Sequence, residues 1–255
     1  MNTFARKTLS TFLLLAIWEV AARLGNFPLI LPTFIDTAKA LVESLLSHDT
    51  NVLNYMRETC YSLFIGFGIG ALIATLLTIF AVNTLFFETL LSTLTSALAP
   101  LPAVAVFPLA LMWFGISYTS IIFIAAFAAV FPVAVSMIQG FHTVPHTLRN
   151  VGRNLGMSRL ELTCRILIPA ALPAILAGLR NGFSNGFRAL VAVEMVIGAA
   201  TGSGGLGWFV MSSKQNLDIP LVYAGILAIM CVGLLFEALF HWIEEKTVKK
   251  WGMLN

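Results

Sequence analysis

The chain has 255 residues, of which 58% are hydrophobic and only 11% are charged. An ordinary soluble domain carries about 25% charged residues, which cover its surface. The net charge of +3 argues against a nucleic-acid binder with a large basic face, and the apolar composition argues against a disordered chain. The composition therefore predicts an all-α protein that has lipid as its solvent.

Six apolar stretches are long enough to cross a bilayer, whose hydrocarbon core takes about 20 residues of helix. The first has Glu19 inside it and no small-residue cleavage site after it, so we expect a helix of the mature protein and not a signal peptide. The predicted spans cover about residues 8–24, 59–82, 85–114, 118–139, 170–199 and 221–243.

The third span contains Pro100, Pro102 and Pro108, so it is predicted to be kinked or broken near its middle. Membrane helices tolerate proline where neighbouring groups satisfy the freed backbone. Broken helices often line a transport path, and Pro102 and Pro108 are therefore candidate path residues. A fixed kink without such a role is an equal alternative.

Residues 31–57, between the first two spans, carry apolar side chains at helical spacing. The pattern predicts an amphipathic helix at the membrane interface. In the second span, Gly66 and Gly70 have the spacing of a close helix–helix contact, although glycine is also frequent in membrane helices generally. The apolar positions of the amphipathic segment are Phe34, Ala38, Leu41 and Leu45.

The basic residues set the expected orientation, because short cytoplasmic loops are enriched in Lys and Arg. With the N-terminus inside, nine basic residues fall in cytoplasmic segments and four fall outside. Both termini are therefore predicted to be cytoplasmic. The inside set is Arg6, Lys7, Arg149, Arg153, Arg159, Arg165, Lys246, Lys249 and Lys250, and the outside set is Arg23, Lys39, Arg57 and Lys214.

Residues 141–169 are the least membrane-like stretch between two spans, and the charge distribution places them in the cytoplasm. Residues 147–156 predict a short helix that presents Arg149 and Arg153 on one face and ends at Gly156. Ser158 is a candidate N-cap for a second helix, with Glu161 completing a capping box. The prediction is a rigid projection; the alternative is a solvated hairpin whose arginines hold the headgroup surface.

The segment from Leu148 to Gly156, followed by Ile168-Pro169 and Pro173, resembles the EAA loop of permease subunits in bacterial ABC importers. Asn150-Val151-Gly152 stands where that loop has Glu-Ala-Ala, whereas Gly156 and the prolines keep their spacing. The resemblance implies that the loop docks on a partner ATPase, with two arginines available for its carboxylates. The implied coupling residues are Arg149, Asn150, Val151, Gly152, Arg153, Gly156 and Pro169.

Further segments, in the same order along the chain, resemble the nitrate, sulfonate, taurine and bicarbonate group of these permeases. The resemblance implies the type I ABC importer (MetI-like) fold with about six transmembrane helices. It also implies a homodimer in the bacterial inner membrane, a cytoplasmic ATPase pair that binds ATP and magnesium, and an extracytoplasmic solute-binding protein. The segments are Trp18-Glu19 before Leu31-Pro32, Pro102–Pro108 before Trp113-Phe114-Gly115, and Val193-Glu194-Met195 before Gly205-Leu206-Gly207.

This organisation divides the chain into three parts. Residues 1–58 would hold the first span and the interfacial segment, residues 59–243 the transmembrane core with its coupling loop at 141–169, and residues 244–255 a cytoplasmic tail.

Arg188 and Glu194 lie inside the fifth span, where a charge costs about 2.5 to 3.5 kcal/mol on insertion scales. They are six residues apart, about 240° around a helix, so they are not expected to pair. An arginine at a central cavity suits an oxyanion, which a guanidinium binds in a bidentate manner. We expect both residues either on the translocation path or with structural partners on other helices.

The sequence thus predicts a transport subunit, not an enzyme: the permease of an ATP-driven importer for a small anionic or zwitterionic solute. No catalytic residue, bound cofactor, metal site or nucleic-acid partner is expected in this chain, whose remaining partner is membrane lipid. The alternatives are a self-sufficient secondary transporter, which usually has more spans and visible repeats, or a non-catalytic membrane subunit of another complex. Which solute is carried stays open, because selection rests largely on the binding protein.

Overall fold

The computed structural model of the chain describes residues 3–25, 27, 29–47 and 51–249. Every regular element within these ranges is a helix, which confirms the predicted fold class. Residues 250–255 of the predicted tail, including Lys250, lie outside the described residues.

Five helices of the described part are long and apolar enough to cross a membrane, and there are six spans if a bent pair is counted as one broken span. The predicted spans are confirmed, with ends shifted by a few residues. The pair consists of α4 (Leu85–Leu98) and the segment Ala103–Phe114, which meet at 92°. The five are α1 (Thr3–Gly25), α3 (Val52–Asn83), α6 (Tyr118–Thr143), α10 (Leu172–Thr201) and α12 (Ile219–Glu244).

The chain forms two compact units, one of residues 1–59 and 194–232 and the other of residues 60–193 and 233–255. The helices α3, α10 and α12 contribute residues to both units.

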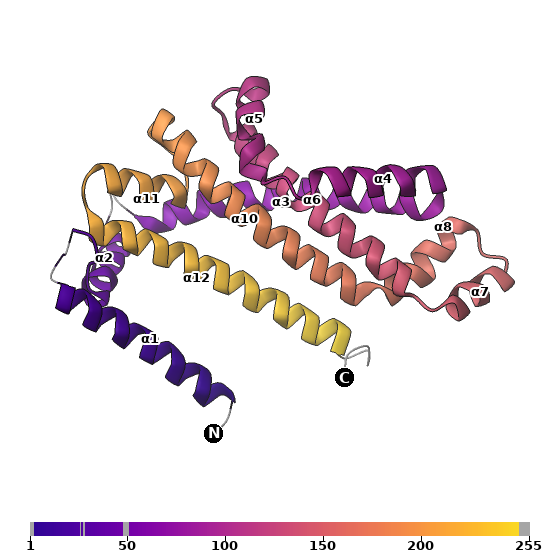
Figure 1. Cartoon of the computed structure of the whole chain (residues 1–255), viewed down its shortest axis with the longest axis horizontal. Coiled ribbons are helices and arrows are strands. Elements are labelled where there is room, and N and C mark those ends of the chain that lie inside the picture. Colours follow the sequence, from indigo (N-terminus) through magenta and orange to yellow (C-terminus); the bar gives the residue numbers. More distant parts are fainter. Residues whose placement is uncertain (1–2, 26, 28, 48–50, 250–255) are drawn as a thin grey trace. The chain divides into compact units, whose positions relative to one another are not determined.

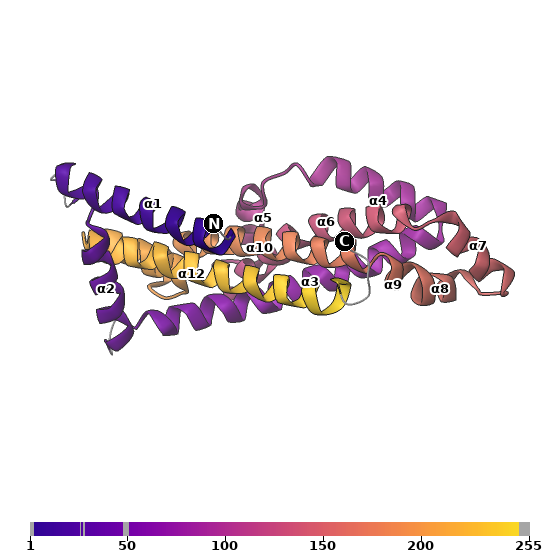
Figure 2. The same cartoon turned by 90° about the horizontal axis from the view of Figure 1, so that it is seen from below.

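In the first unit, a short helix α2 (Phe34–Leu46) follows α1 (Figure 2). It begins where the Thr33 side chain accepts a hydrogen bond from the Asp36 N–H, 3.1 Å away. The Trp18 indole donates to the Pro32 carbonyl (3.1 Å), which fixes the turn between the two helices. The helix predicted within residues 31–57 is present, and its four apolar positions, Phe34, Ala38, Leu41 and Leu45, all lie in α2. The helix α2 ends at Leu46, and α3 begins at Val52, several residues before the predicted start of the second span at about residue 59.

In the second unit, α6 is the most deeply buried span, with small residues along much of its length. Gly66 and Gly70 of α3 lie directly against it: an added Cβ would lie 2.6 Å from the Ala125 Cβ and from the Ala126 carbonyl, respectively. The glycine pair therefore marks a close helix–helix contact and does not only reflect the general frequency of glycine in membrane helices. Gly68, between them, has nothing within 4 Å of an added Cβ.

Large apolar side chains remain exposed along the spans, as expected of helices that face lipid. Leu72 of α3 is 61% exposed, and Leu234 and Leu235 of α12 are 66% and 67% exposed. Water would penalise such a surface, whereas hydrocarbon does not.

The predicted break in the third span is confirmed and has a defined structure. After α4 the chain passes Pro100 and Pro102 into a 3-10 turn η1 (Ala103–Val106), and then into α5 (Phe107–Phe114). Pro108 occupies the first turn of α5, where its missing N–H leaves no bond unmade. Gly115 ends α5 at φ 69°, a left-handed conformation that favours glycine.

Candidate functional site

The predicted projection between α6 and α10 consists of two short helices, α7 (His146–Asn154) and α8 (Arg159–Leu162). Figure 1 shows both beyond the ends of α6 and α10. Gly156 ends α7 at φ 74°. Its N–H donates to the Arg153 carbonyl (3.0 Å), and the Met157 N–H donates to the Gly152 carbonyl (3.1 Å). This is the Schellman pattern, in which glycine satisfies the last carbonyls of a helix.

The second helix begins with the predicted capping box. The Ser158 hydroxyl accepts from the Glu161 N–H, and the Glu161 carboxylate accepts from the Ser158 N–H (2.9 Å). The Ser158 N–H and the Ser158 hydroxyl both donate to the Glu161 carboxylate, and these two bonds lower the pKa of Glu161. A π-helical stretch (Thr163–Leu167) and the short helix α9 (Ile168–Ala170), with Pro169 in its first turn, lead into α10.

The two short helices pack on each other at Gly152. An added Cβ there would lie 2.7 Å from the Ile166 Cδ1 atom and would also meet Leu162. Gly152 is buried, and a larger residue would separate the helices. The projection is therefore a rigid element and not a flexible tether.

The two faces of α7 differ in chemistry. One face carries Leu148 and Val151, which are 44% and 53% exposed, and the C-cap residue Leu155, which is 70% exposed, continues this face. The other carries Arg149 and Arg153, which line a cavity of about 430 Å³. Asn150 is exposed. The apolar stripe is thus open for a partner, whereas the arginines that the resemblance assigned to partner carboxylates lie at the chain's own cavity.

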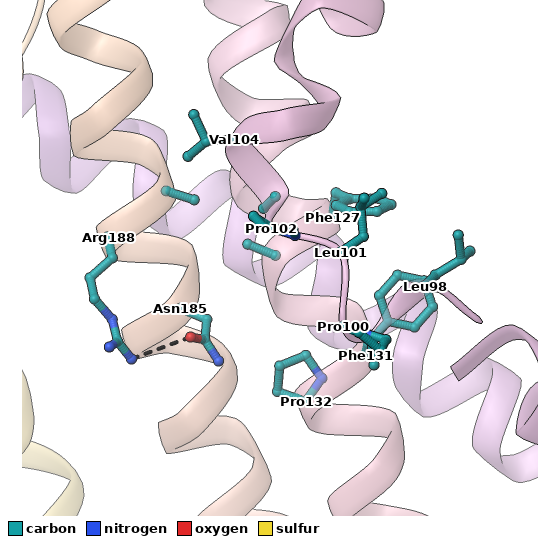
Figure 3. A pocket seen from close by; sticks show the side chains of 14 residues that line it. Leu98, Pro100, Leu101, Pro102, Val104, Phe127, Phe131, Pro132, Asn185 and Arg188 are labelled. Atoms are coloured by element: carbon teal, nitrogen blue, oxygen red, sulfur yellow. Dashed lines mark hydrogen bonds between the residues drawn. The ribbon is translucent and has the colours of Figure 1, made fainter. Parts of the chain in front are cut away.

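The second site is a cavity of about 370 Å³ beside the break in the third span. Figure 3 shows Arg188 and Asn185, both on α10, joined by a hydrogen bond of 3.2 Å. Arg188 also donates to the Ser184 carbonyl (3.1 Å), and no carboxylate pairs with it in the described part of the chain. Pro102 lines the same cavity and Pro108 does not. The remaining walls come from Phe127, Phe131 and Pro132 of α6 and from the segment Leu98–Val104.

Arg180, the other basic residue of the fifth span, has a different environment. Its guanidinium pairs with Glu237 of α12 and lies 3.7 Å from a carboxylate oxygen of Glu244. Arg180 therefore has structural partners, whereas Arg188 presents a charge that is not neutralised by a described residue.

Glu194 is only 2% exposed, and its carboxylate accepts from two buried donors. The Thr59 hydroxyl of α3 lies 3.0 and 2.9 Å from the two carboxylate oxygens, and the Gly207 N–H donates to the second oxygen (3.0 Å). The Leu206 N–H donates to the Thr59 oxygen (2.7 Å).

The Glu194 carboxylate thus caps the helix α11 (Leu206–Gln215), whose first N–H groups have no partner within the helix. Gly205 sits so close that an added Cβ would overlap both the Thr59 hydroxyl and the Glu194 carboxylate. Glu194 was predicted to lie either on the translocation path or with structural partners on other helices. The structure gives it structural partners, Thr59 and Gly207. Thr59, Gly205 and Asn185 were not predicted as site residues; the signal for Asn185 was its i, i+3 spacing from Arg188.

In the described ranges, no group of three or more His, Cys, Asp or Glu side chains is placed to hold a metal ion. His142 instead lies 3.4 Å from the Glu88 carboxylate.

Comparison with known proteins identifies the family. The model of the family described as binding-protein-dependent transport system inner membrane component matches residues 66–249 of this chain. A putative aliphatic sulfonates transport permease protein of Bacillus subtilis is 29% identical, over 92% of this chain and 84% of its own. A nitrate import permease protein of Synechocystis is 29% identical, over 88% of this chain and 77% of its own. A taurine transport system permease protein of Escherichia coli is 33% identical, over 54% of this chain and 49% of its own.

The family works with an ATPase and a solute-binding protein, and its members are transport subunits, not enzymes. The match selects this function over a secondary transporter or a subunit of another complex. The chain therefore belongs to the inner membrane components of binding-protein-dependent transport systems and is the multi-pass permease subunit of an ABC importer.

Proposed function

We propose that this permease moves a small oxyanion or zwitterion of the sulfonate, taurine, nitrate or bicarbonate type past Arg188. The observation that carries the proposal is the unpaired guanidinium of Arg188 in a cavity beside the broken span. Arg188 lies near the middle of α10, where a charge without a partner is costly unless a water-filled path or a ligand accommodates it. The names of the relatives point to the same solute chemistry.

Energy enters through the partner ATPase, which binds ATP and magnesium and hydrolyses ATP, while this chain binds no cofactor. Two copies of the chain assemble with an ATPase pair, and both termini are cytoplasmic, as the distribution of basic residues indicates. A C-terminal epitope should be accessible to antibody only after the inner membrane is permeabilised. Labelling in intact spheroplasts would reverse the assigned orientation.

The coupling contact is the apolar face of α7. Leu148, Val151 and Leu155 project from a helix that is held rigidly by Gly156 and by the packing at Gly152. An amphipathic helix that presents such a stripe docks in a hydrophobic groove of a partner. Gly152, Gly156 and Pro169 position the helix, and Asn150 flanks the contact.

The coupling contact is tested by Leu155→Asp in the reconstituted complex. A buried, unpaired carboxylate in the groove of the ATPase should uncouple ATP hydrolysis from uptake. Uptake should therefore fall while the chain still inserts into the membrane. The matched control is Leu160→Asp, which makes the same change at a similarly exposed position of α8. Equal uptake by Leu155→Asp and wild type would reject α7 as the docking element.

The solute site is tested by replacing Arg188 and measuring uptake in proteoliposomes. A charge-assisted hydrogen bond contributes about 1.5–3 kcal/mol, so Arg188→Gln should reduce solute uptake by about tenfold or more. Arg188→Lys, which keeps the charge and loses the bidentate geometry, should give an intermediate rate. Arg57→Gln removes an exposed charge and serves as the control. Unchanged uptake by Arg188→Gln would exclude Arg188 from the solute path.

A further inference from the structure

Three arginines surround the cavity behind the apolar face of α7. Arg149 and Arg153 come from α7 and Arg159 comes from α8, and the cavity of about 430 Å³ also touches Asn83 at the end of α3. None of the described residues that line it is acidic. The guanidinium groups therefore concentrate positive charge in one concave site.

The donors of these arginines are only partly used. Arg149 donates through Nη2 to the Phe141 carbonyl, whereas its Nε is buried and has no hydrogen-bond partner in the described part of the chain. Arg159 donates through Nη1 to the Asn83 carbonyl (2.9 Å). Arg153 has no hydrogen bond or ion pair with any residue that the structure describes. Because a buried donor without a partner is costly, the site lacks an acceptor that would complete it.

The position of the cavity relative to the membrane spans indicates where that acceptor comes from. Val82 and Asn83 are the last residues of the apolar helix α3, and Leu167 lies shortly before α10 begins. The cavity is thus at the border between a membrane span and the coupling loop, which is the level of the lipid headgroups. Its lining combines the arginines with apolar side chains such as Val82 and Leu162, a combination that fits a phosphate attached to a glycerol and acyl chain.

We propose that this cavity is a binding site for the phosphate of an anionic phospholipid headgroup, held by Arg149, Arg153 and Arg159. Guanidinium groups bind phosphate oxygens in a bidentate manner, and the three positive charges more than balance the single negative charge of one phosphodiester headgroup. A lipid bound there would brace the two short helices from behind while the opposite face of α7 remains free for the ATPase.

The test uses native mass spectrometry of the purified transporter complex with added phosphatidylglycerol, phosphatidylcholine or inorganic phosphate. Wild type should retain phosphatidylglycerol in preference to phosphatidylcholine, whose choline is repelled by the arginines. Arg153→Gln should weaken phosphatidylglycerol binding by about tenfold or more. Because Arg153 has no hydrogen bond or ion pair with a described residue, its replacement breaks no such bond within the described part of the chain.

The control is Arg165→Gln, which removes an equal charge from the same loop at an exposed position that does not line the cavity. Arg153→Lys should restore part of the binding. Retention of phosphatidylglycerol in excess inorganic phosphate identifies the lipid as the ligand. Displacement of the lipid by the free ion, equal lipid binding by Arg153→Gln and wild type, or equal retention of phosphatidylcholine would each overturn the proposal. The readout is independent of uptake, so its failure leaves the roles of α7 and Arg188 untouched.

Discussion

Replacing Glu194 with alanine should destabilise the protein strongly, although the residue does not line the cavity of Arg188. The substitution removes the acceptor of the Thr59 hydroxyl and of the Gly207 N–H, both of which are buried. Each buried donor left without a partner costs about 1–3 kcal/mol, which gives a loss of about 2–6 kcal/mol. Glu194→Gln keeps one acceptor oxygen at the same place and should lose a smaller part of this stability.

The loss can be measured by thermal unfolding of the purified complex in detergent, followed by tryptophan fluorescence. For a chain of this size, 1 kcal/mol corresponds to about 2–4 °C in Tm, so Glu194→Ala should lower Tm by at least about 4 °C. The matched control is Glu88→Ala, which removes a half-exposed carboxylate whose contact with His142 contributes no more than about 1 kcal/mol. A Tm of Glu194→Ala equal to that of wild type, or a loss no greater than that of Glu88→Ala, would refute the capping role.

Three further predictions concern helix packing and the coupling loop. Gly70→Val should destabilise the protein by about 1–3 kcal/mol, because the new Cβ meets the α6 backbone. Gly68→Val, with open space around it, should change the melting temperature little. Equal melting temperatures of the two variants would contradict the close contact at Gly70. Arg180→Ala leaves the Glu237 carboxylate without its ion partner on a membrane-spanning helix, so it should cost about 2.5 kcal/mol or more, and a double-mutant cycle with Glu237→Ala that shows no coupling would contradict this. Gly156→Val should destabilise the turn by about 1–2 kcal/mol, because a valine is strained at a positive φ. ATP-driven uptake should fall while the chain still inserts into the membrane. Uptake at the wild-type rate would contradict a fixed turn at this position.

Local signals predicted the elements whose partners are close in sequence. Long apolar runs located the spans, prolines located the break at Pro102, and Ser158 with Glu161 located the second loop helix. The start of α3 at Val52 was not predicted, because its first turns carry the polar residues Asn54, Arg57 and Glu58.

The partners of the intramembrane charges could not be predicted from local spacing. Thr59 and Glu194 are 135 residues apart, and only the folded chain brings them together at the start of α11. Helical geometry did predict that Arg188 and Glu194 would not pair with each other. The same geometry, applied to Leu148, Val151 and Leu155, would have separated the apolar face of α7 from its arginines before the structure was known.

The most direct test of the account is solute uptake by proteoliposomes that contain the permease, its ATPase and ATP, with and without the solute-binding protein. Taurine, an alkanesulfonate and nitrate would be supplied separately outside. The account predicts accumulation of one class of solute only when all three proteins and ATP are present, and its loss with Arg188→Gln. Accumulation by the permease alone, without ATPase or binding protein, would contradict it.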